Sequence, residues 1–241
     1  ARKYRPQTFA ELIGQEHVRT TLENAITQQR IAHGYIFSGQ RGTGKTTVAR
    51  IMARCLNCEK GPTAAPCGAC ASCTEISAGS AMDVIEIDAA SNRGINEMRE
   101  LRENVRFRPA RDRYKVFIID EAHQITNEAF NALLKTLEEP PPHVKFVFAT
   151  TELRKVPITV LSRCQRFDLR RIDSAELATY LATLAEKEQV KIEEGALALI
   201  ARAAEGSARD SLSLLDQAIA HGEGEMITAE TVRRMLGLAD R

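Results

Sequence analysis

Short apolar runs alternate with stretches of helical periodicity along roughly the first two thirds of the chain. The runs have the length and composition of buried strands and lie at 34–38, 83–87, 116–119 and 144–149. Between them, apolar residues recur at helical spacing over 11–30, 45–56, 95–105 and 127–139, and prolines at 140–142 end the last stretch. This alternation predicts an α/β fold, a parallel sheet with helices on both faces.

The pattern changes after about residue 171. From there to the end the apolar residues follow helical spacing only, in three stripes: Leu177, Leu181, Leu184; Leu197, Ile200, Ala201, Ala204; and Leu212, Leu215, Ile219. The sequence therefore predicts a small all-helical second domain behind the α/β domain.

A glycine-rich loop joins the first predicted strand to the next helix. It reads Gly39-Gln40-Arg41-Gly42-Thr43-Gly44-Lys45-Thr46 and matches the pattern G-x-x-x-x-G-K-[ST]. Glycines let backbone N–H groups curl around a phosphate, and the following helix directs its positive end at the same anion. In this motif the lysine, here Lys45, is a cation for the β- and γ-phosphates, and the hydroxyl of Thr46 is a ligand for Mg²⁺. We expect these eight residues to bind ATP.

Acidic and hydroxyl residues follow two of the later strands. Asp120 and Glu121 come directly after the run at 116–119, where ligands of parallel sheets bind. Asp120 is expected to hold Mg²⁺, and Glu121 is expected to orient the water that attacks the γ-phosphate. Thr150 and Thr151 follow the last strand. A hydroxyl there suits detection of the γ-phosphate, but a plain strand-end hydroxyl fits the sequence equally well.

Four of the six cysteines form a cluster that interrupts the helical pattern. Cys58, Cys67, Cys70 and Cys73 lie within one loop-rich stretch, and the spacing contains two overlapping C-x-x-C turns. Four thiolates match the tetrahedral preference of Zn²⁺, so we expect a structural zinc site. A disulfide pair and a redox C-x-x-C are the rival interpretations. Because the cysteines are not scattered as in a secreted framework, we expect a reducing cytoplasm.

Composition and charge exclude some classes of protein without indicating a partner. The chain has 241 residues, 44% hydrophobic and 27% charged, with a formal net charge of +1. These values are typical of a globular protein. No apolar run approaches the ~20 residues of a membrane span, so we expect no membrane association. A local basic stretch contains Arg106, Arg108, Arg111, Arg113 and Lys115, and it fits either a solvated connection or a polyanion contact.

Taken together, these motifs resemble the AAA-plus ATPases, and within them the gamma/tau family of bacterial DNA polymerase III clamp-loader subunits. The resemblance covers essentially the whole chain. It is carried by the phosphate loop, the acidic run 120–123 and four further segments: Arg5-Pro6-Gln7-Thr8-Phe9, Gly14-Gln15-Glu16, Leu137-Glu138-Glu139-Pro140-Pro141 and Ser162-Arg163-Cys164. It implies an AAA-plus ATPase domain at 1–171, with a zinc knuckle at about 57–74, and a helical lid at 172–241.

The resemblance also implies roles for single residues. Arg163 is similar to the arginine finger that reaches the γ-phosphate bound by a neighbouring subunit. Arg209 is similar to the second-sensor arginine, and Thr151 to the first sensor. Ser207 and Asp210 have capping-box spacing, which predicts that Arg209 lies in the first turn of a helix, where a cation opposes the dipole. The segments 5–6 and 13–14 would border the adenine.

The resemblance further implies partners. They are the other clamp-loader subunits in a hetero-oligomeric ring, the sliding clamp, and primed DNA held through its phosphates, with Ser91, Asn92 and Arg93 facing the DNA. Two rivals remain. A branch-migration helicase motor is disfavoured by the cysteine cluster and by 162–164, and a nucleotide-binding scaffold without turnover is disfavoured by Thr46, Glu121 and Arg163.

Overall fold

The structure is a computed structural model that describes residues 2–91, 95–222, 224 and 226–238. Its centre is a five-stranded sheet in which every pair of neighbouring strands is parallel. The strand order is β2-β3-β4-β1-β5. The strands are β1 (Gly34–Ser38), β2 (Val84–Asp88), β3 (Lys115–Asp120), β4 (Val144–Thr150) and β5 (Gln165–Asp168).

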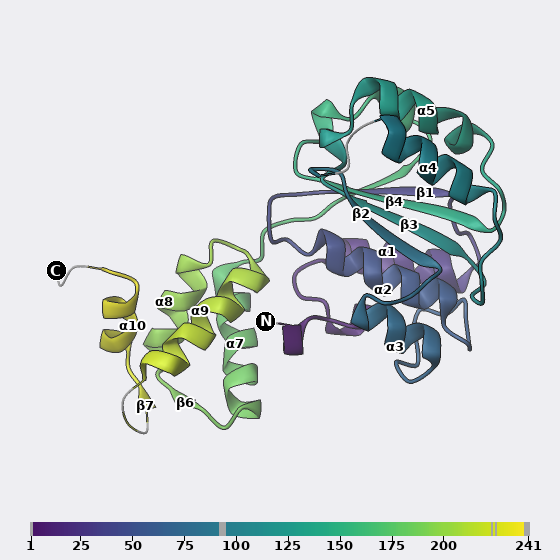
Figure 1. Ribbon diagram of the computed structural model, residues 1–241. Helices are drawn as coiled ribbons and strands as arrows, with labels where there is room; N and C mark the ends of the chain where they lie inside the picture. Colours follow the sequence, from purple (N-terminus) through teal and green to yellow (C-terminus); the bar gives the residue numbers. More distant parts are fainter. Residues whose placement is uncertain (1, 92–94, 223, 225, 239–241) are drawn as a thin grey trace.

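Helices cover both faces of this sheet (Figure 1). One face carries α1 (Glu16–Thr27) and α2 (Lys45–Asn57), with α3 (Ala71–Ala78) beyond α2. The other face carries α4 (Ile95–Val105) and α5 (Asn127–Glu138), and the short α6 (Ile158–Leu161) contacts α5. Alternate residues of β1 enter different cores, since Tyr35 and Phe37 face α1 and α2 whereas Ile36 faces α4 and α5. The predicted parallel sheet flanked by helices is confirmed.

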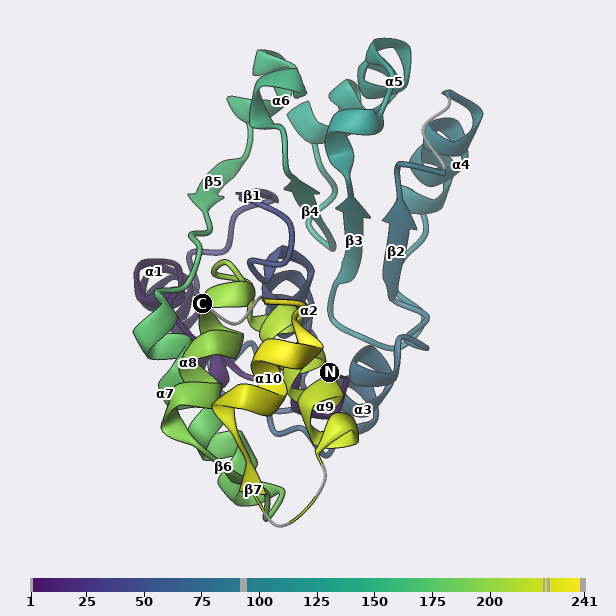
Figure 2. The same ribbon diagram turned by 90° about the vertical axis from the view of Figure 1, so that its left-hand side faces the viewer.

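The described residues after 173 form a separate helical cluster beside the sheet (Figure 2). It contains α7 (Ser174–Lys187), α8 (Glu194–Ala203), α9 (Ala208–His221) and α10 (Ala229–Met235). The predicted leucine and alanine stripes lie in the core of this cluster. One feature differs from the all-helical expectation: β6 (Lys191–Ile192) and β7 (Met226–Ile227) form a two-residue parallel ladder. Within the described residues no helix is long and apolar enough to cross a bilayer.

Two elements of the sheet domain have no clear sequence signal. Strand β5 pairs with β1 at the sheet edge, and three of its four residues are exposed, so it lacks the apolar run of a buried strand. Helix α3 begins inside the cysteine cluster, where the Cys70 sulfur accepts a hydrogen bond from the Cys73 N–H and caps the helix. Only Ser72, Cys73 and Ile76 of α3 are buried, which leaves a weak helical pattern.

Candidate functional site

The phosphate loop occupies the turn between β1 and α2. Gly42 and Gly44 have φ angles of 81° and 100°, a region that residues with a Cβ rarely adopt. Lys45 is the first residue of α2, and its Nζ donates to the carbonyl oxygens of Gly39 and Gln40, both at 2.8 Å. The loop therefore has the backbone freedom, the helix start and the cation that the motif predicts.

The acid pair faces this loop from β3. Asp120 is the last residue of β3, and the Thr46 hydroxyl donates to its Oδ2 at 3.4 Å. Burial lowers the pKa of Lys45, while the negative charges of Asp120 and Glu121 oppose that effect. Arg209 acts on the same ammonium and lowers its pKa further. These interactions place the Lys45 ammonium, both acids and a residue of α9 in one region.

Glu121 has an unusual backbone. Its φ of 53° lies in the left-handed region, which is uncommon for a residue other than glycine and often occurs at functional sites. The ring of His123 is almost fully buried beside it. His123 Nε2 lies 3.4 Å from Glu121 Oε2 and 3.3 Å from Glu152 Oε2, and Nδ1 lies 2.9 Å from Thr150 Oγ1. Local sequence gives no signal that His123, Glu152 and Thr150 form this network.

The hydroxyls at the end of β4 differ in their surroundings. Thr150 is fully buried and pairs with Ser38, the last residue of β1, so it lies at the edge of the sheet where the phosphate loop begins. Its Oγ1 also accepts from the Glu152 N–H at 3.0 Å. Thr151, the predicted sensor, lies one residue beyond the strand and is exposed. The geometry favours Thr150 for a hydroxyl that faces the site.

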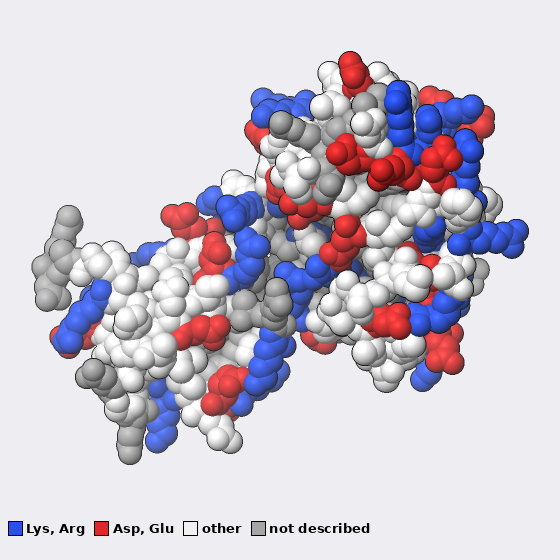
Figure 3. Space-filling model, in the orientation of Figure 1, with Lys and Arg blue, Asp and Glu red and all other residues white. Residues whose placement is uncertain are grey.

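The helical cluster contacts the phosphate loop through the start of α9. A Cβ on Gly42 would lie 2.3 Å from Ser207 Oγ, so only glycine fits there. Ser207 caps α9 by accepting from the Asp210 N–H, as the spacing predicts, and Arg209 lies in the first helical turn. Buried Gln15 links the phosphate loop to the segment that leads from β5 to the helical cluster, since its amide donates to the Arg170 carbonyl at 2.6 Å and to the Thr43 carbonyl at 3.4 Å. Lys and Arg side chains gather along this junction (Figure 3).

Arg163 lies on the surface and bonds to two groups of its own chain, one local and one from α5. Its NH1 donates to the Thr159 carbonyl and its NH2 to Glu138 Oε1, each at 2.9 Å. Within the described residues, no hydrogen bond or ion pair joins Arg163 to the phosphate loop of its own chain. This placement suits a residue that acts on a neighbouring molecule.

The four clustered cysteines converge in the folded chain. Their sulfur atoms all lie within 4.8 Å of one another, so the cluster could hold a metal ion. Tetrahedral zinc with Zn–S bonds of about 2.3 Å separates its sulfurs by about 3.8 Å, which this cluster can reach. Backbone N–H groups of Ala69 and Cys70 donate to Cys67 and lower the pKa of that thiol to about 6. Burial raises the pKa of the Cys73 thiol.

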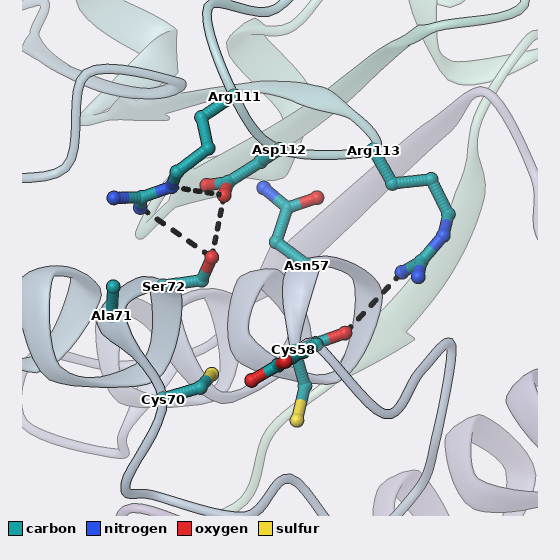
Figure 4. A pocket seen from close by; sticks show the side chains of 9 residues that line it. Asn57, Cys58, Cys70, Ala71, Ser72, Arg111, Asp112 and Arg113 are labelled. Carbon is teal, nitrogen blue, oxygen red and sulfur yellow. Dashed lines mark hydrogen bonds and ion pairs between the residues drawn. The ribbon is translucent and has the colours of Figure 1, made fainter.

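A small pocket beside the cluster contains part of the basic stretch (Figure 4). Arg111 binds Glu75 at 2.8 Å and Asp112 at 3.1 Å. Arg113 NH1 donates to the Leu56 carbonyl at 2.7 Å, close to the end of α2. These arginines therefore tie α2, α3 and the connection before β3 together. The finding favours a structural connection over a polyanion contact for this part of the stretch.

The segments expected to border the adenine pack against the sheet domain and the start of the helical cluster. Arg54, which is buried in α2, donates to the carbonyls of Pro6 and Gln7 and so holds the N-terminal segment against the domain. Gly14 packs against Ile172. Ser91 is exposed, whereas Asn92 and Arg93 lie outside the described residues.

Two family models match the chain. The first, described as "DNA polymerase III, delta subunit", matches residues 14–173. The second, described as "DNA polymerase III clamp loader subunit, ATPase lid domain", matches residues 176–224. Together they cover the sheet domain and most of the helical cluster.

Curated relatives match over nearly the whole chain but extend well beyond it. DNA polymerase III subunit tau of Escherichia coli is 54% identical over 240 residues, which are 100% of this chain and 37% of that protein. Subunit tau of Bacillus subtilis is 51% identical, with coverage of 98% and 42%. Subunit gamma of Buchnera aphidicola is 44% identical, with coverage of 99% and 64%. The chain thus spans less than half the length of the tau relatives named here.

Solved structures share the fold at low sequence identity. The RuvB Holliday junction branch migration motor of Thermotoga maritima superposes with a TM-score of 0.71 at 20% identity. The match covers 98% of this chain and 72% of that one. At this identity the similarity concerns the fold alone.

Proposed function

Because this chain belongs to the family of DNA polymerase III clamp-loader subunits, we propose that it is the ATP-hydrolysing motor portion of a loader that places a sliding clamp on primed DNA. The observation that carries this proposal is the meeting of the phosphate loop and the acid pair, where Thr46 Oγ1 lies 3.4 Å from Asp120 Oδ2. The named relatives are subunits of DNA polymerase III. Residues 1–171 would serve as the ATPase domain and 172–241 as its lid.

In this proposal ATP is the substrate and the loop cradles its phosphates. Backbone N–H groups of residues 39–46 and the Lys45 ammonium bind the β- and γ-phosphates. Glu121 orients a water molecule and takes its proton as the water oxygen bonds to the γ-phosphorus. The bond from that phosphorus to the bridging oxygen breaks, and ADP leaves with the electron pair. Magnesium, for which the adjacent oxygens of Thr46 and Asp120 suit as ligands, would neutralise developing charge.

Further residues would respond to whether the bound nucleotide carries a γ-phosphate. Arg209 at the start of α9 would approach the phosphates of its own chain, supported by its influence on the Lys45 pKa. Arg163 would stabilise the transition state in a neighbouring subunit. A hydroxyl at the end of β4 would sense the γ-phosphate. The family resemblance implies Thr151 for this role, whereas the burial and contacts of Thr150 support Thr150.

The proposed partners follow from the same family. They are sister subunits in a hetero-oligomeric ring, the sliding clamp, and primed DNA contacted through phosphates. ATP binding would favour binding of the clamp and the DNA by the loader, and ATP hydrolysis would favour their release. Cytoplasmic localisation is proposed because the described cysteines are free thiols, with four of them grouped for a metal.

An ATPase assay tests the motor function. Hydrolysis is measured for the chain alone, with its sister subunits, and with clamp and primed DNA added. We expect the rate to rise on assembly and again with clamp and DNA. Stimulation by branched DNA without a clamp would favour a helicase motor, and binding without turnover in every mixture would favour a scaffold.

We also propose that the cysteine cluster is a structural zinc site. Four sulfur ligands leave no open coordination position, so the metal would stabilise the loop and not take part in hydrolysis. Metal analysis is expected to find one zinc per chain, and Cys67→Ser is expected to lose it. Cys164→Ser, which changes a cysteine outside the cluster, serves as the control and should retain zinc. An empty site with all four thiols titratable would contradict the proposal.

A further inference from the structure

The guanidinium of Arg163 is anchored at two points. NH1 donates to the Thr159 carbonyl, which belongs to α6, and NH2 donates to Glu138 Oε1. Thr159 is four residues earlier in the chain, whereas Glu138 comes from a different helix and is 25 residues away. The ion pair with Glu138 is therefore a tertiary contact that local sequence does not produce.

Glu138 is held by a well-packed element. It is the last residue of α5, whose Phe130 and Leu133 are essentially fully buried against the sheet. The N–H of Glu139 closes the helix on the Lys135 carbonyl, and prolines at 140–142 prevent its continuation. The position of the Glu138 backbone is thus defined by the core of the ATPase domain, while its side chain reaches the surface.

The two anchors leave most of the guanidinium able to bind an anion. An arginine side chain offers five N–H donors in a planar fork, and these bonds engage two of them. The other three remain for phosphate oxygens. A long arginine side chain loses much rotamer freedom when it is ordered, so an anchor that is already in place lowers the entropy cost of reaching the phosphate.

We propose that Glu138 is a positioning residue, which holds Arg163 in the orientation needed to reach the nucleotide of a neighbouring subunit. The inference rests on the proposed role of Arg163 as a finger acting between subunits. Glu138 acts through Arg163 and does not touch the nucleotide. Since side chains of both residues are partly exposed, at 34% for Arg163 and 43% for Glu138, the effect is limited by solvent screening.

The test compares Glu138→Ala with Glu139→Ala in the complete loader assembled with clamp and primed DNA. Glu139 is the adjacent exposed carboxylate, and it is not paired with Arg163 in the described structure. We expect Glu138→Ala to lower kcat about two- to fivefold, the range for an exposed ion pair. The KM for ATP should not change, because the finger stabilises charge that develops only in the transition state. Glu139→Ala should leave both constants unchanged.

A conservative variant and a double variant distinguish a positioning role of Glu138 from a general loss of folding or stability. Glu138→Gln keeps an oxygen that accepts from Arg163, so its kcat should lie between those of wild type and Glu138→Ala. Combining Glu138→Ala with Arg163→Ala should give the rate of Arg163→Ala alone, measured in single turnover. Circular dichroism and Tm should be the same for all single variants.

The outcomes distinguish this inference from the proposed function. If Arg163→Ala leaves hydrolysis by the assembly intact, the finger role itself fails. If Arg163→Ala abolishes hydrolysis but Glu138→Ala has no effect, or raises kcat, the positioning role of Glu138 is wrong. A further loss from Glu138→Ala in the Arg163→Ala background would also overturn it, because the residue would then act independently of the finger.

Discussion

Replacing Lys45 by alanine is expected to abolish useful ATP turnover, with a fall of about 10²- to 10³-fold in kcat/KM, the range for losing one preorganised charge-stabilising group. The ammonium is held at the start of α2 by the carbonyls of Gly39 and Gln40, next to the acid pair. Burial lowers its pKa, while Asp120 and Glu121 oppose this shift and favour the charged form that phosphate binding needs.

Steady-state ATP hydrolysis and nucleotide titration measure the effect of Lys45→Ala. Lys187→Ala serves as the control, because Lys187 is an exposed lysine in the last turn of α7, in the helical cluster. The lysine variant also loses two hydrogen bonds to the loop, so the Tm is compared with wild type to exclude unfolding. Normal turnover by a folded Lys45→Ala protein would refute the phosphate-binding role.

Arg163→Ala is expected to lower hydrolysis by the assembled loader about 10³- to 10⁵-fold while nucleotide binding by the chain is retained. The reason is that a guanidinium from a neighbouring subunit stabilises charge that develops on the γ-phosphate only in the transition state. Within its own chain Arg163 bonds to Glu138 and Thr159, so its removal should leave the chain's own phosphate loop unchanged.

The control for Arg163→Ala is Arg166→Ala. Arg166 is an exposed arginine three residues later, paired with Asp168 at 3.1 Å. Hydrolysis in the assembly and binding of a labelled nucleotide are measured for both variants. If isolated wild-type chains hydrolyse ATP as fast as the assembly does, the proposal of a finger acting between subunits fails.

The sequence predicts the interior of the sheet domain well because burial on both faces leaves continuous apolar runs. Strands β1 to β4 lie within about one residue of the predicted runs. The edge strand β5 was missed, since a strand with one neighbour and an exposed face needs no apolar run. The boundary of α1 was also too wide, because it begins at Glu16, beyond the turn at Gly14.

The candidate site also has some features that local sequence predicts and others that depend on the folded structure. The proposed phosphate binding by residues 39–46 depends on glycine backbone freedom and on a helix start, both within eight consecutive residues. A sequence motif is therefore enough to predict it. The family resemblance implies Thr151 as the sensor, whereas the structure shows that Thr150 is the hydroxyl that ends the buried strand and contacts His123. Asp120 beside Thr46 was expected from the rule that ligands bind at the carboxyl ends of parallel strands.

Local sequence patterns are enough to predict the alternation of strands and helices, the phosphate loop, the capped start of α9 and the four-cysteine spacing. Each depends on residues close together in the chain, where periodicity, glycine conformation and capping act. The folded structure is needed to see that Gly42 packs against Ser207, that His123 lies between Glu121 and Thr150, and that Glu138 bonds to Arg163. Those contacts join distant segments, and their geometry comes from how the helices pack on the sheet, which local patterns do not encode.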